Sequence, residues 1–518
     1  MKRFLLLIGL AVTLALLIGC AAVDDPANDA PDNPPQQNTV PEDPADSVPA
    51  LQTFSLPYYQ QVTLDPITCP DGAHQAIGAL LYDGLYVLDR QFAPQPALAE
   101  SCTYDRETFV YTIRLRSGAV FSDGSPLTAQ DAAASLLRAR NSSRYGGRLA
   151  EVISVTPGEG VVYVALSRPN SSFTARLDIP IVKAGTENSA VPIGAGRYLW
   201  QEDEEGACLV PNPYSWRRQE LPIPRIPLVP CKDADAAAYA FLSREIQLIA
   251  YDVTGTGAIR VSGRSTYTDA PTSIMQYVGF NTDSPVFSDA ALRAAAARGI
   301  DRNACVNACL LGHGAAASLP ISPASALYPA DAEIACSSEA YEAALADAGY
   351  AGGTERTVTM LVSAENAFRV QAAQRIAEDL SRGDLQITVR VLPWVEFREA
   401  LAAGDYDLYY GECKLTADWD LSPLLAPDGA LNFSRYTDEA LPDLLDRAAR
   451  AGTAAIRAVA LRDLYNWLGR EAPFTPVCFK NISVLLPDKA VDAIQPTAAD
   501  PFYDLADWTI HWAESTPS

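Results

Sequence analysis

The feature that most constrains the fold is a strand, a helix and a second strand that follow one another closely. Residues 358–362 form an apolar run that is typical of a buried strand. Residues 366–381 place apolar side chains on one helical face, and apolar residues then alternate with polar ones over 387–391. Such a unit of about 35 residues requires a partly parallel sheet, so the sequence predicts an α/β fold.

Other segments carry local signals for a strand or for a helix end. Apolar residues alternate with polar ones from Phe109 to Leu115, which predicts a half-buried strand. Thr128 precedes a helical segment with an acid in its first turn, and we expect it to be the N-cap. Ser288 and Asp301 are expected to cap two consecutive helices, the second of which ends at Gly312.

Length and charge limit the classes of function. A chain of 518 residues is suited to two or three domains. Its 63 acidic and 39 basic residues give a net charge of -24, which argues against nucleic acid as a partner, because binding phosphates needs a basic surface. The sequence lacks the common nucleophile-elbow, phosphate-loop and zinc-helix motifs and has three histidines. We therefore expect no catalytic residues, no cofactor and no metal site.

The N-terminus predicts export and attachment to a membrane. The basic start Met1–Arg3 is followed by the apolar run Phe4–Ile18, which is too short to span about 30 Å of hydrocarbon and is typical of a secretory signal. Leu17–Cys20 resembles a bacterial lipobox, so Cys20 is the expected lipidation site and residues 1–20 are the expected signal peptide. This predicts a lipid-anchored protein on the extracytoplasmic face of the cell membrane. The alternative is an ordinary signal peptide with a chance cysteine.

Residues 21–52 are expected to form a disordered acidic linker. They contain seven prolines and seven acids, with no lysine or arginine. A segment of this composition cannot bury enough apolar surface to fold, and its prolines and charge keep it extended.

Nine cysteines follow Cys20 in the chain. An exported protein permits disulfides, but the odd number leaves at least one thiol unpaired. Structural disulfides or buried thiols are expected. A metal site at Cys305 and Cys309, which share one helix face, is a weaker alternative because histidine partners are missing.

Several motifs in consistent order carry a resemblance to a known family. They are Leu81–Leu85, Phe121–Asp131, Gly194–Tyr198, Gly279–Thr282 and Arg298–Arg302. Together they resemble the family 5 extracellular solute-binding proteins, the oligopeptide, dipeptide and nickel receptors of ABC importers. The resemblance covers about residues 53 to 515.

The resemblance implies a two-lobed periplasmic-binding-protein-like fold (type II, cluster C) with a hinge and an additional α/β domain. The implied divisions are lobe I at 53–87, 197–280 and 485–518, the additional domain II at 88–196, and lobe II at 281–484. The hinge is expected where the chain crosses between lobes, near Tyr277 to Asn281 and near Leu485.

The resemblance also implies residues that contact the ligand. In peptide receptors of this family an acid of the second lobe pairs with the α-ammonium of the ligand, and Asp418 is the best candidate here, with Asp420 second. The family pattern places a tryptophan before the acid, whereas here Trp419 follows it, which leaves the register open by one or two residues. The further candidates for ligand contact are Trp394, Trp419, Tyr277 and His74.

These observations predict a monomeric, lipid-anchored substrate-binding protein that captures peptides in a cleft between lobes and delivers them to the permease of an ABC importer. One alternative is the same fold binding an opine, an oligosaccharide or a chelated metal, or serving as a peptide-sensing receptor. An alternative of a different class is a surface hydrolase that uses Glu412, Asp418 and Asp420.

Overall fold

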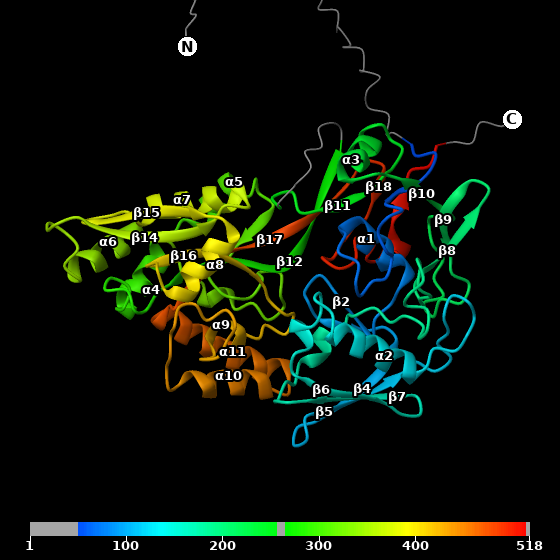
Figure 1. Ribbon diagram of the computed structural model, residues 1–518, viewed down its shortest axis with the longest axis horizontal. Helices are drawn as coiled ribbons and strands as arrows, with labels where there is room; N and C mark the ends of the chain where they lie inside the picture. The colour runs from blue at the N-terminus through cyan, green and yellow to red at the C-terminus, as the bar shows by residue number, and fades with distance from the viewer. Residues whose placement is uncertain (1–49, 256–264, 514–518) are drawn as a thin grey trace, which may run out of the picture. The chain divides into compact units, whose positions relative to one another are not determined.

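Three larger sheets, each with its own apolar core, organise the computed structural model, which describes residues 50–255 and 265–513 (Figure 1). The predicted lipidation site Cys20 and residues 21–49 of the predicted linker lie outside the described residues. Leu51, at the end of that predicted linker, is buried and bridges to Trp512, so the fold already includes it.

The first sheet gathers strands that are far apart in the chain. Its order is β1 (Leu56–Tyr58), β10 (Ile226–Pro230), β9 (Gly206–Pro211) and β8 (Tyr198–Asp203), with the first pair parallel and the others antiparallel. Leu80 of α1 (Gly72–Leu81) and Trp508 near the C-terminus pack into its core. Nearby elements are α3 (Ala234–Leu242), β18 (Val491–Asp492), η5 (Leu505–Asp507) and β19 (Thr509–Ile510).

The second sheet is antiparallel and is formed from one continuous part of the chain. Its order is β4 (Ala99–Asp105), β5 (Val110–Leu115), β7 (Val161–Leu166) and β6 (Val152–Pro157). The predicted strand at Phe109–Leu115 is confirmed as β5, and Thr128 caps α2 (Ala129–Arg140) through a capping box with Asp131. The remaining elements are β2 (Tyr86–Leu88), β3 (Pro94–Pro96), η2 (Gly147–Leu149) and η3 (Phe173–Arg176).

The largest sheet of the described residues contains the predicted strand–helix–strand unit. β14 (Arg356–Ser363) and β15 (Leu385–Leu392) are parallel and are joined by α7 (Ala367–Leu380), which confirms the prediction. The strand order is β11 (Ile249–Tyr251), β17 (Phe474–Pro487), β12 (Ser265–Phe280), β16 (Leu408–Lys414), β14 and β15, with β13 (Gly314–Ala316) paired to β17.

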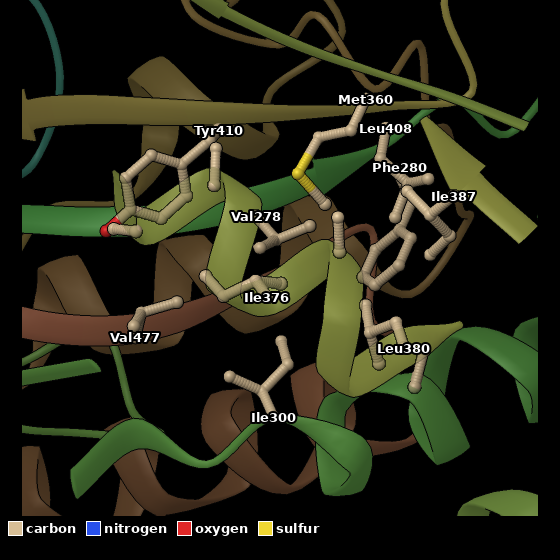
Figure 2. Packing of buried hydrophobic residues seen from close by; sticks show 14 of the residues in the cluster. Val278, Phe280, Ile300, Met360, Ile376, Leu380, Ile387, Leu408, Tyr410 and Val477 are labelled. Carbon is tan, nitrogen blue, oxygen red and sulfur yellow. The ribbon is translucent and has the colours of Figure 1, made fainter. Parts of the chain in front are cut away.

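Helices cover both faces of this sheet because apolar residues alternate along its strands. On one face Met360 and Leu408 pack against Ile376 and Leu380 of α7 (Figure 2). The same core takes in α4 (Ala290–Gly299), α5 (Arg302–Cys309) and α6 (Ser338–Asp347). The opposite face packs against α8 (Trp394–Ala403), α9 (Ser422–Leu425), α10 (Leu441–Arg450) and α11 (Ala454–Glu471), with η4 (Ala330–Ala332) beside them.

Two of the predicted helix ends differ from the structure. Asp289, and not Ser288, is the N-cap of α4, since its carboxylate accepts from the amide of Ala291. Asp301 caps α5 as predicted, but this helix ends at Cys309 rather than at Gly312. Aspartate competes well with serine for the N-cap, so a one-residue error arises where the two are adjacent.

The long strands β12 and β17 pass from one core to another while paired with each other. On β17, Phe479 belongs to a core of the largest sheet, whereas Val484 belongs to the core of the first sheet. On β12 the ladder is interrupted by register shifts between Pro271 and Met275 and between Gln276 and Tyr277. The irregular stretch of this ribbon therefore reaches Tyr277, the first residue of the segment Tyr277 to Asn281 where the sequence predicts the hinge.

All nine cysteines of the described residues are free thiols. Cys305 and Cys309 are both buried, and burial raises the pKa of Cys305 to about 12. Cys305 and Cys309 are therefore buried thiols in the structure, which is one of the two alternatives, disulfides or buried thiols, expected for the cysteines. No helix among residues 50–255 and 265–513 is both long and apolar enough to span a bilayer.

Candidate ligand-binding cleft

A cavity of about 1260 Å³ is lined by segments from all three sheet regions. The lining includes stretches within 82–92, 143–151, 271–274, 413–431 and 497–500. This volume exceeds the roughly 300–1,000 Å³ of typical small-molecule sites, so it has room for an extended ligand of several residues. Apolar side chains on its walls offer contact area for aliphatic groups, among them Tyr86, Phe92, Leu415, Leu424 and Ile482.

Asp418 and Asp420 belong to an arginine–carboxylate cluster that also contains Arg168, Arg176 and Glu151. Arg176 donates from Nε to Asp418 Oδ2 at 2.7 Å and from Nη2 to Asp420 Oδ2 at 3.0 Å. Arg168 pairs with Asp420 and with Glu151. The arginines come from the region of the second sheet and the aspartates from the loop after β16, so the cluster joins two separate parts of the fold.

The arginines decide the charge state of both aspartates. Burial acts to raise the pKa of Asp418, but the charge of Arg176 outweighs it and holds the pKa below its ordinary value. Asp420 follows the same balance, with Arg168 and Arg176 as the opposing charges. Both carboxylates are therefore ionised at neutral pH and already have cationic partners. Glu151 is different, because burial outweighs the two arginines and raises its pKa.

A second charged feature, the Lys414 group, consists of Lys414, Arg144 and Arg148. All three side chains line the cavity. Lys414, the last residue of β16, and Arg144 have no carboxylate within ion-pair distance among the described residues, whereas Arg148 pairs with Asp178. Desolvation by the cleft walls, with the charges of Arg148 and Arg144, lowers the pKa of Lys414 to about 8, although its side chain remains exposed to the cavity. The group is a local excess of positive charge.

His74 has a place in the core of the first sheet region. Its Nε2 accepts a hydrogen bond from the amide of Tyr59 at 2.8 Å, and its Nδ1 lies 3.2 Å from the carbonyl oxygen of Thr63. The ring stacks on Tyr58 and Tyr59, and burial lowers its pKa. Both ring nitrogens are thus occupied by the backbone, and His74 is not part of the cavity lining.

The remaining aromatic candidates also lie away from the cavity lining. Trp419 is buried and packs edge-on against Phe92, which does line the cavity. Tyr277 is buried in β12, and Trp394 is half exposed at the start of α8, stacked on Phe397. Of the six predicted ligand contacts, all within the described residues, Asp420 alone lines the cavity, and Asp418 is buried and shares Arg176 with Asp420. Ligand contact by the other four stays a prediction.

The three acids considered for hydrolysis fall into two separate groups. Glu412 accepts from Gln276 Nε2 at 2.9 Å and lies 3.7 Å from Lys480 Nζ, whereas Asp418 and Asp420 bind Arg176. Among residues 50–255 and 265–513 no set of three or more His, Cys, Asp or Glu side chains is placed to hold a metal ion.

Sequence reasoning missed the bases of the cleft, although the chain carries a signal for them. Four arginines and no acid occur between residues 138 and 148, which is unusual in a chain with an excess of acids. Lys414 stands four residues before Asp418, next to the place where the order of acid and tryptophan departs from the family pattern. The pairing of Arg176 with Asp418, 242 residues away, has no local signal.

Comparisons with known proteins agree with this architecture. The family model for bacterial extracellular solute-binding proteins, family 5 (middle), matches residues 93–427. The glutathione-binding protein GsiB of Escherichia coli (strain K12) is 24% identical over 449 residues, which are 81% of this chain and 87% of GsiB.

Solved structures with the same fold include HbpA2 from Haemophilus parasuis, with a TM-score of 0.73 and 20% identity over 89% of this chain and 99% of HbpA2. The oligopeptide-binding protein AppA from Bacillus subtilis, in complex with a nonapeptide, has a TM-score of 0.59 and 19% identity over 89% of this chain and 98% of AppA. At this level of identity the likeness concerns the fold.

Proposed function

Because the chain belongs to the bacterial extracellular solute-binding proteins of family 5, we propose that it captures peptides in the cleft and delivers them to the membrane subunits of an ABC importer. The observation that carries the proposal is the cavity of about 1260 Å³, whose walls come from segments that belong to different cores. A ligand that contacts both walls stabilises one arrangement of them, and this arrangement is what a permease can recognise.

Two of the similar proteins support a peptide as the ligand. GsiB is named for binding glutathione and AppA was solved with a nonapeptide, and both ligands are peptides. The cavity combines apolar walls with charged groups at fixed positions, as a ligand with a regular backbone and variable side chains requires. Asp420 is the proposed point of contact among the predicted acids. The paired state of Asp418 and Asp420 supports binding without turnover, since neither carboxyl group holds a proton to donate.

We assign the membrane attachment to Cys20, with residues 21–49 as the tether. Acyl chains contribute about 0.8 kcal/mol per buried CH₂, so two or more of them hold an extracytoplasmic domain at the membrane. The test is metabolic labelling of the full-length chain with a palmitate analogue in a bacterial host. The label is expected in the wild type and absent in Cys20→Ser, and equal labelling of both would refute the assignment.

The test of peptide capture uses the full-length chain, extracted in mild detergent without denaturation. Mass spectrometry of the small molecules released by heating is expected to find peptides in intact form. Recovery of an oligosaccharide, an opine or a metal chelate instead would refute peptide capture in favour of another solute. Cleavage of added peptides over hours would refute the receptor role in favour of the hydrolase.

A further inference from the structure

We propose that the ligand is an anionic peptide whose carboxylate is held by Lys414 and Arg144, beside Arg148, and that its amino terminus need not be free. This inference rests on the proposed function and adds the chemical class of the ligand.

The first step is the charge balance of the cavity. Acids outnumber bases 63 to 39 over the whole chain, yet equal numbers of acidic and basic side chains line the cavity. The wall of the cleft is therefore enriched in positive charge relative to the rest of the protein. An acidic protein repels anions at long range, so a site for an anion needs a region where bases offset the excess of acids.

The second step is that most of the acids in the cleft already have partners. Asp83 pairs with Arg217, Asp178 with Arg148, and Asp500 with Arg197. Asp420 and Glu151 belong to the arginine–carboxylate cluster. The carboxylate of Asp89 accepts hydrogen bonds from amides of its own turn, and Asp428 is the exposed acid that remains.

The third step is that the Lys414 group has unused hydrogen-bond donors. The ammonium of Lys414 has no hydrogen-bond or ion-pair partner among the described residues and faces the cavity. Arg144 uses Nη1 for the carbonyl oxygen of Cys69 at 3.0 Å and lies over the ring of Tyr145, which fixes its guanidinium at the wall. The like charges of Arg144 and Arg148 act on Lys414 without a compensating acid. A bound carboxylate would remove this repulsion and accept charge-assisted hydrogen bonds.

The fourth step concerns the other end of the ligand. Asp418, the acid expected to bind an α-ammonium, is buried and accepts from Arg176 Nε and from Asn170 Nδ2, both at 2.7 Å. Its side chain is 2% exposed and lies outside the cavity lining, so a ligand ammonium could reach it only by displacing the residues that cover it, the almost fully buried Arg176 among them. Arg176 therefore takes the position that a free amino terminus would take, and a blocked amino terminus does not weaken binding.

The experiment is a capture assay with the full-length chain in detergent and an equimolar mixture of tripeptides. The mixture contains Ala-Glu-Ala and its isostere Ala-Gln-Ala, each with a free or acetylated amino terminus and a free or amidated carboxyl terminus, together with Ala-Lys-Ala forms. Bound peptides are separated by rapid gel filtration and quantified by mass spectrometry.

We expect anionic peptides to be enriched at least tenfold over their neutral isosteres, with or without acetylation. If peptides with an amidated carboxyl terminus keep the preference, the bound carboxylate is that of the glutamate side chain. If the preference requires a free carboxyl terminus, the bound carboxylate is the terminal one. Lys414→Gln and Arg144→Gln are each expected to abolish the preference, and Lys414→Arg to keep it. Lys183→Gln, at an ion pair outside the cavity lining, is the matched control and should behave as the wild type.

Capture of peptides without regard to charge, or capture that requires a free amino terminus, overturns the inference and leaves the proposed function standing. Enrichment of the Ala-Lys-Ala forms also overturns it, since the bases would then repel the ligand that the protein selects. Capture of none of the peptides by a folded wild-type chain contradicts the proposed function, and the inference with it. Thermal unfolding curves of each variant establish that the chain is folded.

Discussion

Arg176 offers a direct measure of how much the arginine–carboxylate cluster contributes to stability. Its side chain is 4% exposed and reaches Asp418 and Asp420, with Glu151 Oε1 3.5 Å from Nη1. In Arg176→Met, Asp420 and Glu151 keep Arg168, but Asp418 loses its ion-pair partner while remaining buried. Breaking a buried pair costs about 3–5 kcal/mol, and the retained contacts place the expected loss near the lower value, at about 3 kcal/mol.

The assay is urea unfolding followed by tryptophan fluorescence, with thermal unfolding in parallel. With about 2.1 cal/mol/K of unfolding entropy per residue, about 450 described residues give about 1 kcal/mol per kelvin, so Tm should fall by about 3 °C in a single cooperative transition. Adding Asp418→Asn to Arg176→Met should restore part of the loss, because a neutral amide needs no counter-charge and can still accept from Asn170. Arg462→Met, at the exposed pair with Asp331, is the control and should leave Tm unchanged.

The cluster also has a pH signature with a defined sign. The pKa values of Asp418 and Asp420 are depressed in the folded state, so their contribution is complete above the unfolded value of about 4 and is lost as the pH falls below it. Arg176→Met should therefore lose less stability than the wild type between pH 5 and pH 2. Equal stability of wild type and Arg176→Met at pH 7, or no recovery in the double variant, would refute the reasoning.

Three further outcomes are expected. The affinity for an anionic peptide should fall by up to about tenfold between pH 7 and pH 9, because the pKa of Lys414 is about 8 and only its charged form holds a carboxylate. Calorimetry in two buffers should detect proton uptake on binding near pH 8. A pH-independent affinity would contradict this prediction. His74→Phe should cost about 1–3 kcal/mol of stability, because it leaves the amide of Tyr59 without its hydrogen-bond acceptor. Peptide capture by the folded protein should not change. Loss of capture without loss of stability would instead place His74 at the ligand. Thr128→Ala should cost about 1 kcal/mol in urea unfolding, and no change would mean that the capping box does not stabilise α2.

The sequence predicts best the features that depend on local chemistry. The capping box of Thr128 and Asp131 involves residues three positions apart, and the βαβ unit from β14 to β15 follows from the spacing of apolar residues. The predicted start of α4 and the predicted end of α5 differ from the structure by one and three residues. At a helix end, neighbouring residues can satisfy the free backbone amide or carbonyl groups almost equally well.

The features of the cleft depend on contacts between distant segments, and the sequence predicts them poorly. The family resemblance identifies Asp418 and Asp420 as candidates. Arg176, the partner of Asp418, belongs to η3, which lies more than 200 residues earlier in the chain. Trp419 and Tyr277 are buried in the core and lie outside the cavity lining, and their contact with the ligand stays a prediction. Lys414 is a single base on a strand, and only the fold brings it near Arg144.

The pairing of β12 with β17 limits how the two walls of the cleft can move. Since each strand hydrogen-bonds to the other on both sides of the irregular stretch at Pro271–Met275, neither can slide without breaking the ladder. At this stretch, relative motion of the two cores that the ribbon joins takes the form of bending or twisting of the ribbon and not of sliding of its strands. Because residues 271–274 of that stretch also line the cavity, a substitution there would change the bending of the ribbon and the contact with a bound molecule together.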